Sequence, residues 1–293
     1  MFAGGAVRGV AGAVARRWAA VAAVAAVLLT VSALRAPSAS AFPGALDFGG
    51  MQRTYLVHVP AGVDRPSGLV LNLHGGGQNG GQQMALSNYN VAADRQGFLV
   101  AYPDGIDMSW ADGRGASVPD RTGVDDVGFL VALAGQLADQ YGIDRANVFA
   151  TGMSAGGFMT TRLGCERPDV FAAIAPMAAT YTSAFPCTPS QPVSVIGAHG
   201  NADPVVPFNG GPMIGRGGPS EIVPAPVMAQ RWFDVNGCPP PVVEPGPGVL
   251  IRTATGCADG AEVEFVQIEG GDHRWPTGVF DASQAGAQFF AEH

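Results

Sequence analysis

Ser154 is the residue of this sequence best placed to act as a nucleophile. It lies in Gly152-Met153-Ser154-Ala155-Gly156, between a β-branched and aromatic run at 147–151 and a stretch at 159–166 that predicts a helix. A serine in Gly-x-Ser-x-Gly between a strand and a helix is typical of a nucleophile elbow, whose tight turn requires small flanking residues. Glycine makes up 42 of the 293 residues, so the pattern alone is a weak signal and its value depends on partner residues.

Two residues further along the chain could activate this serine. A serine hydroxyl is a weak nucleophile that needs a base such as imidazole, and the imidazole needs a carboxylate to set its tautomer and stabilise its charge. His273 is the candidate base because, apart from the terminal His293, it is the only histidine after the candidate carboxylate Asp203. Asp272 and Asp169 are the reserve carboxylates.

The competing interpretations of these residues are structural. Ser154 could be only a turn residue, and Asp203, which precedes a proline, could be an ordinary turn starter. Of the other histidines, His58 lies within a predicted strand, His74 is expected to brace a glycine loop, and His199 is expected to be structural or to support the site indirectly.

Ester and amide chemistry at a serine also needs donors for the oxyanion of the tetrahedral intermediate. Removing one such donor typically lowers the rate by about 10²–10³. The backbone N–H of Ala155, directly after the serine, is one candidate, and the glycine loop that follows His74 offers the other, with Gly76 favoured. Glycine suits that loop because backbone can approach a substrate where no Cβ intervenes.

The chain must fold so that these residues meet, and its periodicity predicts how. Apolar runs typical of buried strands alternate with segments of helical spacing, which predicts βαβ units and a mostly parallel sheet. The predicted strands are 51–59, 69–73, 97–102, 148–151, 171–177, 192–198 and 261–268, and the predicted helices are 84–95, 125–137, 159–166, 227–235 and 282–292. Residues 105–123 and 209–226 are predicted loops, and no repeat or linker divides the chain, which predicts a single domain.

The candidate residues follow directly after predicted strands. The loop at 74–77, Ser154, Asp203 and His273 each come after one, and in an open α/β sheet ligands bind beyond the carboxyl ends of the strands. The chain order Ser, Asp, His is the order of α/β-hydrolases. The adjacent acids Asp125 and Asp126 are interpreted as a cap and a carboxylate at the positive end of a helix, rather than as a metal site.

The N-terminus is typical of a secretory signal peptide. Arginines precede an apolar run at 18–34, and Ala39-Ser40-Ala41 offers small residues for cleavage, which predicts a signal peptide at 1–41 and a mature domain at 42–293. The alternative is a retained membrane anchor, because the apolar run approaches the length of a membrane span. Cleavage removes four arginines and no acids, so the formal charge falls from −8 to −12, which disfavours nucleic acid as a partner.

Four cysteines fall in the predicted mature domain, and an exported chain matures where disulfides persist. Two disulfides are therefore expected among Cys165, Cys187, Cys238 and Cys257. Three connectivities are possible, of which the pairing that closes two short loops is the economical one. A zinc site is the alternative, but no Cys-x-x-Cys or nearby histidine supports it.

Taken together, these motifs resemble the secreted esterase family of polyhydroxybutyrate depolymerases and feruloyl or acetylxylan esterases. The similarity extends over about 50–292 and rests on His74-Gly75-Gly76-Gly77, Asp125-Asp126-Val127-Gly128-Phe129, Gly152-Met153-Ser154-Ala155-Gly156, the stretch 171–176, His199-Gly200-Asn201-Ala202-Asp203, Asn236-Gly237-Cys238 and Gly270-Gly271-Asp272-His273-Arg274-Trp275-Pro276. The resemblance implies an α/β-hydrolase fold, no cofactor, and a triad of Ser154, Asp203 and His273.

The resemblance leaves the substrate open. Relatives often carry a Trp-Asn and a cysteine pair in the loop that here reads Ser109-Trp110-Ala111-Asp112-Gly113, without cysteine. Trp110 and Trp275 are candidates for the pocket wall, with simple packing as the alternative. The predicted partner is a small or oligomeric ester, with a polyester or a plant cell-wall polysaccharide also open, and no membrane anchor remains after cleavage. The alternatives to a secreted esterase are an acyltransferase and a noncatalytic binding protein on the same scaffold.

Overall fold

The computed structural model describes residues 41–293 together with Met1. The predicted signal peptide at 1–41 therefore lies outside the described residues, except for its two ends. Across the described part, no helix combines the length and the apolar character that crossing a membrane requires.

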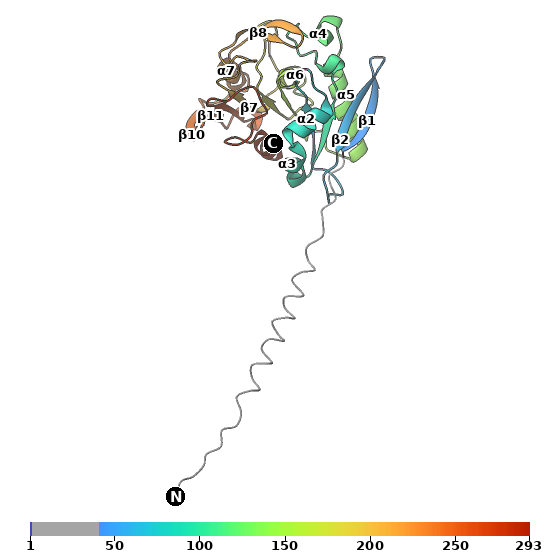
Figure 1. Cartoon of the computed structure of the whole chain (residues 1–293), viewed down its shortest axis with the longest axis vertical. Coiled ribbons are helices and arrows are strands. Elements are labelled where there is room, and N and C mark those ends of the chain that lie inside the picture. Colours follow the sequence, from blue (N-terminus) through green and yellow to red (C-terminus); the bar gives the residue numbers. More distant parts are fainter. Residues whose placement is uncertain (2–40) are drawn as a thin grey trace. The chain divides into compact units, whose positions relative to one another are not determined.

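A ten-stranded sheet, in the order β1-β2-β4-β3-β5-β6-β7-β12-β11-β10, forms the centre of the fold (Figure 1). The five pairings from β4 to β12 are parallel, and the outer pairings at both edges are antiparallel. The strands are β1 (Ala41–Phe48), β2 (Met51–His58), β3 (Gly68–Leu73), β4 (Phe98–Pro103), β5 (Val148–Met153), β6 (Ala173–Met177), β7 (Ser194–Gly200), β10 (Val242–Gly246), β11 (Val249–Ala254) and β12 (Val263–Ile268).

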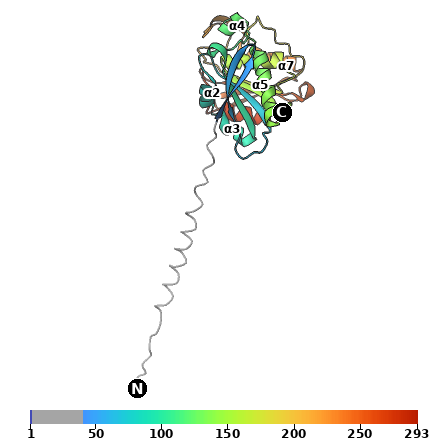
Figure 2. The same cartoon turned by 90° about the vertical axis from the view of Figure 1, so that its right-hand side faces the viewer.

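Helices cover both faces of the sheet. On one face α5 (Asp126–Tyr141) packs on β3, α6 (Ala155–Glu166) packs on β3, β5 and β6, and α7 (Ala225–Val235) packs on β7 and β12. On the other face α3 (Tyr89–Gln96) packs on β4, and α8 (Ala282–Ala291) packs on β6, β7 and α3. Figure 2 shows α5 beside the edge strands β1 and β2, where the Phe48 and Phe129 rings lie 6.3 Å apart.

The central strands are buried on both faces, which is why they read as unbroken apolar runs. Every residue of β3, β4, β5 and β7 is buried. The mostly parallel sheet with helices on both faces confirms the predicted α/β class.

Several predicted segments differ from the structure. The helix predicted at 84–95 is two helices, α2 (Gly80–Ser87) and α3, because Asn88 between them adopts a left-handed conformation with φ 47°. The predicted loop at 209–226 contains an antiparallel hairpin of β8 (Gly211–Gly215) and β9 (Gly218–Ile222). The predicted loop at 105–123 contains the short helices η1 (Ile106–Met108) and α4 (Val118–Thr122), and one further turn, η2 (Ala258–Gly260), precedes β12.

Both disulfides close short loops. Cys165 of α6 is bonded to Cys187, and Cys238, just after α7, is bonded to Cys257. Of the three possible connectivities this is the one that the sequence spacing favours. The first bond ties α6 to the loop between β6 and β7, and the second ties the end of α7 to the turn after β11.

Candidate active site

Ser154 occupies a sharp turn between β5 and α6. Its backbone has φ 55° and ψ −121°, a combination that side-chain-bearing residues rarely adopt. A Cβ added to Gly152 would lie 2.6 Å from the carbonyl oxygen of Gly156, and one added to Gly156 would lie 2.1 Å from that of Leu73. The strand, the turn and the helix thus pack so closely that the flanking glycines are required, as the elbow motif predicts.

Two further loops bring polar side chains to the same edge of the sheet. Asp203 follows β7 and His273 follows β12, and both strands run parallel to β5. His273 Nε2 lies 3.0 Å from Ser154 Oγ, and His273 Nδ1 lies 2.7 Å from Asp203 Oδ2. With Nδ1–H donating to the carboxylate, Nε2 is free to accept the hydrogen of the serine hydroxyl.

The surroundings of Asp203 keep it ionised. Its Oδ1 accepts the backbone N–H groups of Val205 and Val206, each at 2.8 Å, and its Oδ2 faces His273 and, at 3.5 Å, His199 Nε2. Burial raises the pKa of Asp203, but the hydrogen bonds from His199, His273 and Val206 outweigh burial and hold the pKa well below its usual range. The side chain can therefore stay negatively charged although it is fully buried.

The two reserve carboxylates are engaged elsewhere. Asp272 pairs with Arg274, and Asp169 pairs with Arg167 at 2.7 Å. Both pairs are partly exposed to solvent, unlike Asp203. Asp203 is therefore the carboxylate that the structure brings to His273.

His74 braces the glycine loop from inside the protein. It is fully buried, its Nδ1–H donates to the Gly75 carbonyl at 2.8 Å, and its Nε2 accepts the Gly105 N–H at 2.9 Å. Burial lowers the pKa of His74, so the ring remains neutral, as these two bonds require. Trp110 Nε1–H donates to the His74 carbonyl at 2.9 Å, which links this brace to the following loop.

The glycine loop passes directly over the serine. A Cβ on Gly75 would lie 3.6 Å from Ser154 Cβ. The neighbouring amides are occupied: Gly75 N–H donates to Gln78 Oε1 at 3.1 Å, and Gly77 N–H donates to the Met108 carbonyl at 2.8 Å. These bonds hold the loop so that Gly76 and Ala155 line one cavity together with Ser154 and His273.

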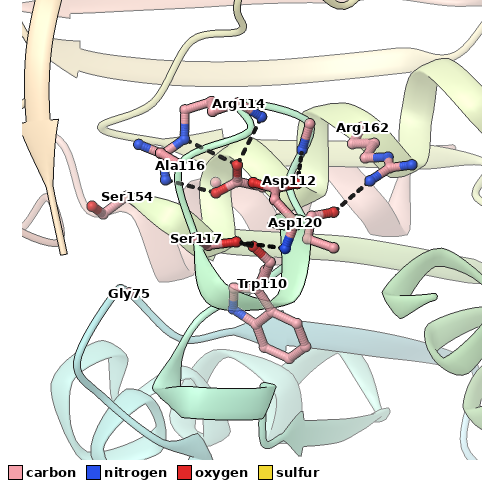
Figure 3. A network of polar contacts seen from close by, with 12 residues as sticks. Gly75, Trp110, Asp112, Arg114, Ala116, Ser117, Asp120, Ser154 and Arg162 are labelled. Carbon is pink, nitrogen blue, oxygen red and sulfur yellow. Dashed lines mark hydrogen bonds and ion pairs between the residues drawn. The ribbon is translucent and has the colours of Figure 1, made fainter. Parts of the chain in front are cut away.

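This cavity measures about 180 Å³ and has a mixed polar and apolar wall. Besides the residues already named it is lined by Ser109, Arg114, Ala116, Ser117, Val205, Met213, Gly215, Arg216 and Gly217. The loop at 109–117 and the β8–β9 hairpin thus supply most of the remaining wall. Figure 3 shows the 109–117 loop beside Ser154.

The family model for PHB depolymerase esterases matches residues 53–207, more than half of the chain. The chain belongs to this esterase family. It is a carboxylic ester hydrolase.

The relatives of this esterase agree with that assignment. It is 30% identical over 255 residues to the putative esterase NocK of Nocardia uniformis, covering 79% of this chain and 73% of NocK. It is also 30% identical over 241 residues to feruloyl esterase C of Emericella nidulans, covering 78% of each chain. The acetyl xylan esterase of Aspergillus awamori superposes with a TM-score of 0.60 at 17% identity, covering 85% of this chain and 99% of that one, and so shows the shared α/β-hydrolase fold.

The two tryptophans predicted for the pocket wall lie outside this cavity. Trp110 and Trp275 are both buried, and neither lines the cavity. Trp110 supports the glycine loop, and Trp275 Nε1–H donates to Ser283 Oγ at 3.0 Å under α8. Both side chains pack inside the protein, which was the alternative interpretation.

Sequence reasoning missed the two arginines of the cavity wall, Arg114 and Arg216. Both lie in segments predicted as loops, where no periodicity indicates the direction of a side chain.

The adjacent acids Asp125 and Asp126 were interpreted more accurately. Asp125 Oδ1 caps α5 by accepting a hydrogen bond from the Gly128 N–H at 2.7 Å. Asp126 has a further role. It accepts hydrogen bonds from Arg53 Nη2 and from the Ala111 N–H, each at 2.7 Å, and so anchors the 109–117 loop.

Proposed function

We propose that this esterase is a secreted serine hydrolase that cleaves carboxylic esters through an acyl-Ser154 intermediate. The observation that carries the proposal is the continuous chain of contacts from Ser154 Oγ to His273 Nε2, 3.0 Å, and from His273 Nδ1 to Asp203 Oδ2, 2.7 Å. The three residues would act as nucleophile, general base and buried counter-charge.

The proposed reaction has two halves. In the first, His273 takes the hydroxyl proton while Ser154 attacks the ester carbonyl, and the N–H groups of Gly76 and Ala155 stabilise the oxyanion. The tetrahedral intermediate collapses, His273 gives the proton to the departing alcohol, and an acyl-serine remains. In the second half His273 activates a water molecule that releases the acid and restores Ser154.

The proposed substrates are feruloyl, acetyl or hydroxybutyrate-type esters. This choice is supported by the family and by the relatives named feruloyl esterase and acetyl xylan esterase. Release from the cell is supported by the predicted signal peptide at 1–41 and by the two disulfides, which persist in oxidising compartments. We propose residues 42–293 as the mature esterase domain.

The test is a pair of serine variants. Ser154→Ala should abolish hydrolysis of 4-nitrophenyl butyrate and labelling by a fluorophosphonate probe, because the nucleophile is lost. Ser190→Ala, at an exposed bend, is the matched control and should retain both. Turnover by folded Ser154→Ala would refute the proposal. If the variant is inactive, a screen of methyl ferulate, acetylated xylan and hydroxybutyrate oligomers with the wild type defines the acyl group that it cleaves.

A further inference from the structure

Two guanidinium groups line the cavity that contains Ser154. Arg114 comes from the 109–117 loop and Arg216 from the turn between β8 and β9. Hydrolysis of a neutral ester requires no cation in this wall, whereas guanidinium groups are the usual partners of carboxylates. The contacts of each arginine indicate whether its charge is available to a substrate.

The charge of Arg114 is already matched inside the protein. Its Nη2 lies 2.6 Å from Asp112 Oδ2 and its Nε lies 3.0 Å from Oδ1, so the two side chains form a bidentate pair (Figure 3). The guanidinium also stacks over Phe158 at 4.1 Å, and the side chain is only 7% exposed. Arg114 therefore acts as a structural part of the wall.

Arg216 has a weaker partner. Its Nη2 is 3.6 Å from Asp107 Oδ1, beyond the 2.7–2.9 Å typical of a charge-assisted hydrogen bond, and its Nε donates to the Asp107 carbonyl at 3.2 Å. The Arg216 side chain is 38% exposed and the Asp107 side chain 45% exposed. The guanidinium can thus donate to an additional anion in the cavity.

The turn between β8 and β9 packs against the 109–117 loop, and this packing fixes the position of Arg216. A Cβ on Gly217 would lie 2.3 Å from the Ala116 carbonyl oxygen, so the turn sits directly on the 109–117 loop. Arg121 Nη1 ties the two together by donating to the carbonyls of Gly217, at 2.9 Å, and Ala116. This docking holds Arg216 at a defined place in the wall.

Arg216 lies next to the glycine loop that follows His74. A Cβ on Gly76 would lie 3.3 Å from Arg216 Cβ, and a Cβ on Gly77 would lie 3.6 Å from Arg216 Nη1. Arg216 thus lies against the loop proposed to hold the oxyanion. In the proposed reaction this loop binds the oxygen of the ester carbonyl, which belongs to the acyl part that stays on Ser154.

We infer that Arg216 binds a carboxylate carried by the acyl group, so that the preferred substrates include monoesters of dicarboxylic acids. The inference rests on the proposed function, because it places the acyl group on Ser154. The measured quantity is the ratio of kcat/KM for 4-nitrophenyl hydrogen adipate to kcat/KM for 4-nitrophenyl hexanoate. These esters share the leaving group and the six-carbon acyl chain, and differ in the terminal carboxylate.

Arg216→Gln should lower this ratio about tenfold, because the charge-assisted bond to the carboxylate is lost. Arg216→Lys should restore most of the ratio, because it keeps the positive charge. Asp107→Asn should raise the ratio twofold or more, because it removes the competing carboxylate, and asparagine tolerates the positive φ of 53° at this position. Arg145→Gln, an exposed arginine paired with Asp139, is the control that should leave both rates unchanged.

An Arg216→Gln variant that loses activity equally on both esters would overturn the inference, as would an Asp107→Asn variant with a lower ratio. Failure of the proposed function has a different signature, in which the wild type and Ser154→Ala hydrolyse hexanoate at the same rate. Hexanoate hydrolysis that depends on Ser154, with a ratio insensitive to Arg216, would refute this inference alone.

Discussion

Replacing Asp203 by asparagine tests the catalytic geometry most directly. Asp203 Oδ1 accepts two backbone N–H groups, from Val205 and Val206, each at 2.8 Å. An asparagine must therefore place its oxygen at Oδ1 and its NH₂ group at the Oδ2 position, 2.7 Å from His273 Nδ1. Two donors cannot face each other, so His273 would carry its proton on Nε2 instead of Nδ1.

In this variant His273 could no longer act as the base for Ser154, although the fold would be retained. Nε2–H cannot accept the Ser154 proton, and an equivalent change in a triad lowers kcat by about 10⁴. That factor corresponds to about 5.4 kcal/mol of transition-state stabilisation. The loop itself should persist, since the asparagine oxygen keeps both amide bonds.

The assay is kcat for 4-nitrophenyl butyrate, with thermal unfolding at pH 7 as the folding control. Asp203→Asn should lose about four orders of magnitude in kcat while still unfolding cooperatively. A loss below tenfold in a folded variant would refute the reasoning, because it would mean that His273 does not depend on this carboxylate.

The same variant has a pH signature in stability. The pKa of Asp203 lies below its usual value despite burial, because His199, His273 and Val206 donate to it, so ionised Asp203 stabilises the fold above its unfolded pKa of about 3.9. That contribution is lost as the pH falls through the lower folded pKa. The free energy of unfolding of wild type should therefore fall more steeply than that of Asp203→Asn below pH 4, and parallel curves would contradict this.

Two further predictions concern the scaffold. Gly156→Ala should lower the free energy of unfolding by more than about 3 kcal/mol and reduce esterase activity, because the new Cβ would lie 2.1 Å from the Leu73 carbonyl oxygen; wild-type melting in this variant would contradict the packing of the elbow. Replacing Cys238 and Cys257 together by serine should cost about 3 kcal/mol, because their bond closes a loop with a sequence separation of 19, and urea unfolding with and without reductant would measure it.

Much of the fold could be predicted from local patterns. The strands from β3 to β7 are continuous apolar runs because both of their faces are buried, and β12 alternates recognisably. The hairpin β8–β9 was missed because its strands are rich in glycine and proline, and they are held by pairing with each other and by docking on the 109–117 loop. The break at Asn88 was missed because it depends on a single left-handed residue.

The identity of the reactive groups, and the order in which they follow the strands, can be read from the amino-acid sequence. A parallel sheet brings the carboxyl ends of its strands to one edge, so Ser154, Asp203 and His273 could be expected near one another from their positions alone. The same reasoning does not separate Asp203 from Asp272, which also follows a predicted strand, and the contact of Asp203 with His273 depends on the packing of the two loops.

The distances between these groups and the composition of the cavity wall depend on tertiary packing. The contacts of His273 with Ser154 and Asp203 join residues 119 and 70 positions apart, and their lengths depend on how whole strands and loops pack. Trp110 became a support for the glycine loop rather than a pocket wall, and Arg216 reached the cavity through the docking of its hairpin. Side-chain directions in irregular loops follow from such long-range packing and cannot be predicted from local sequence patterns.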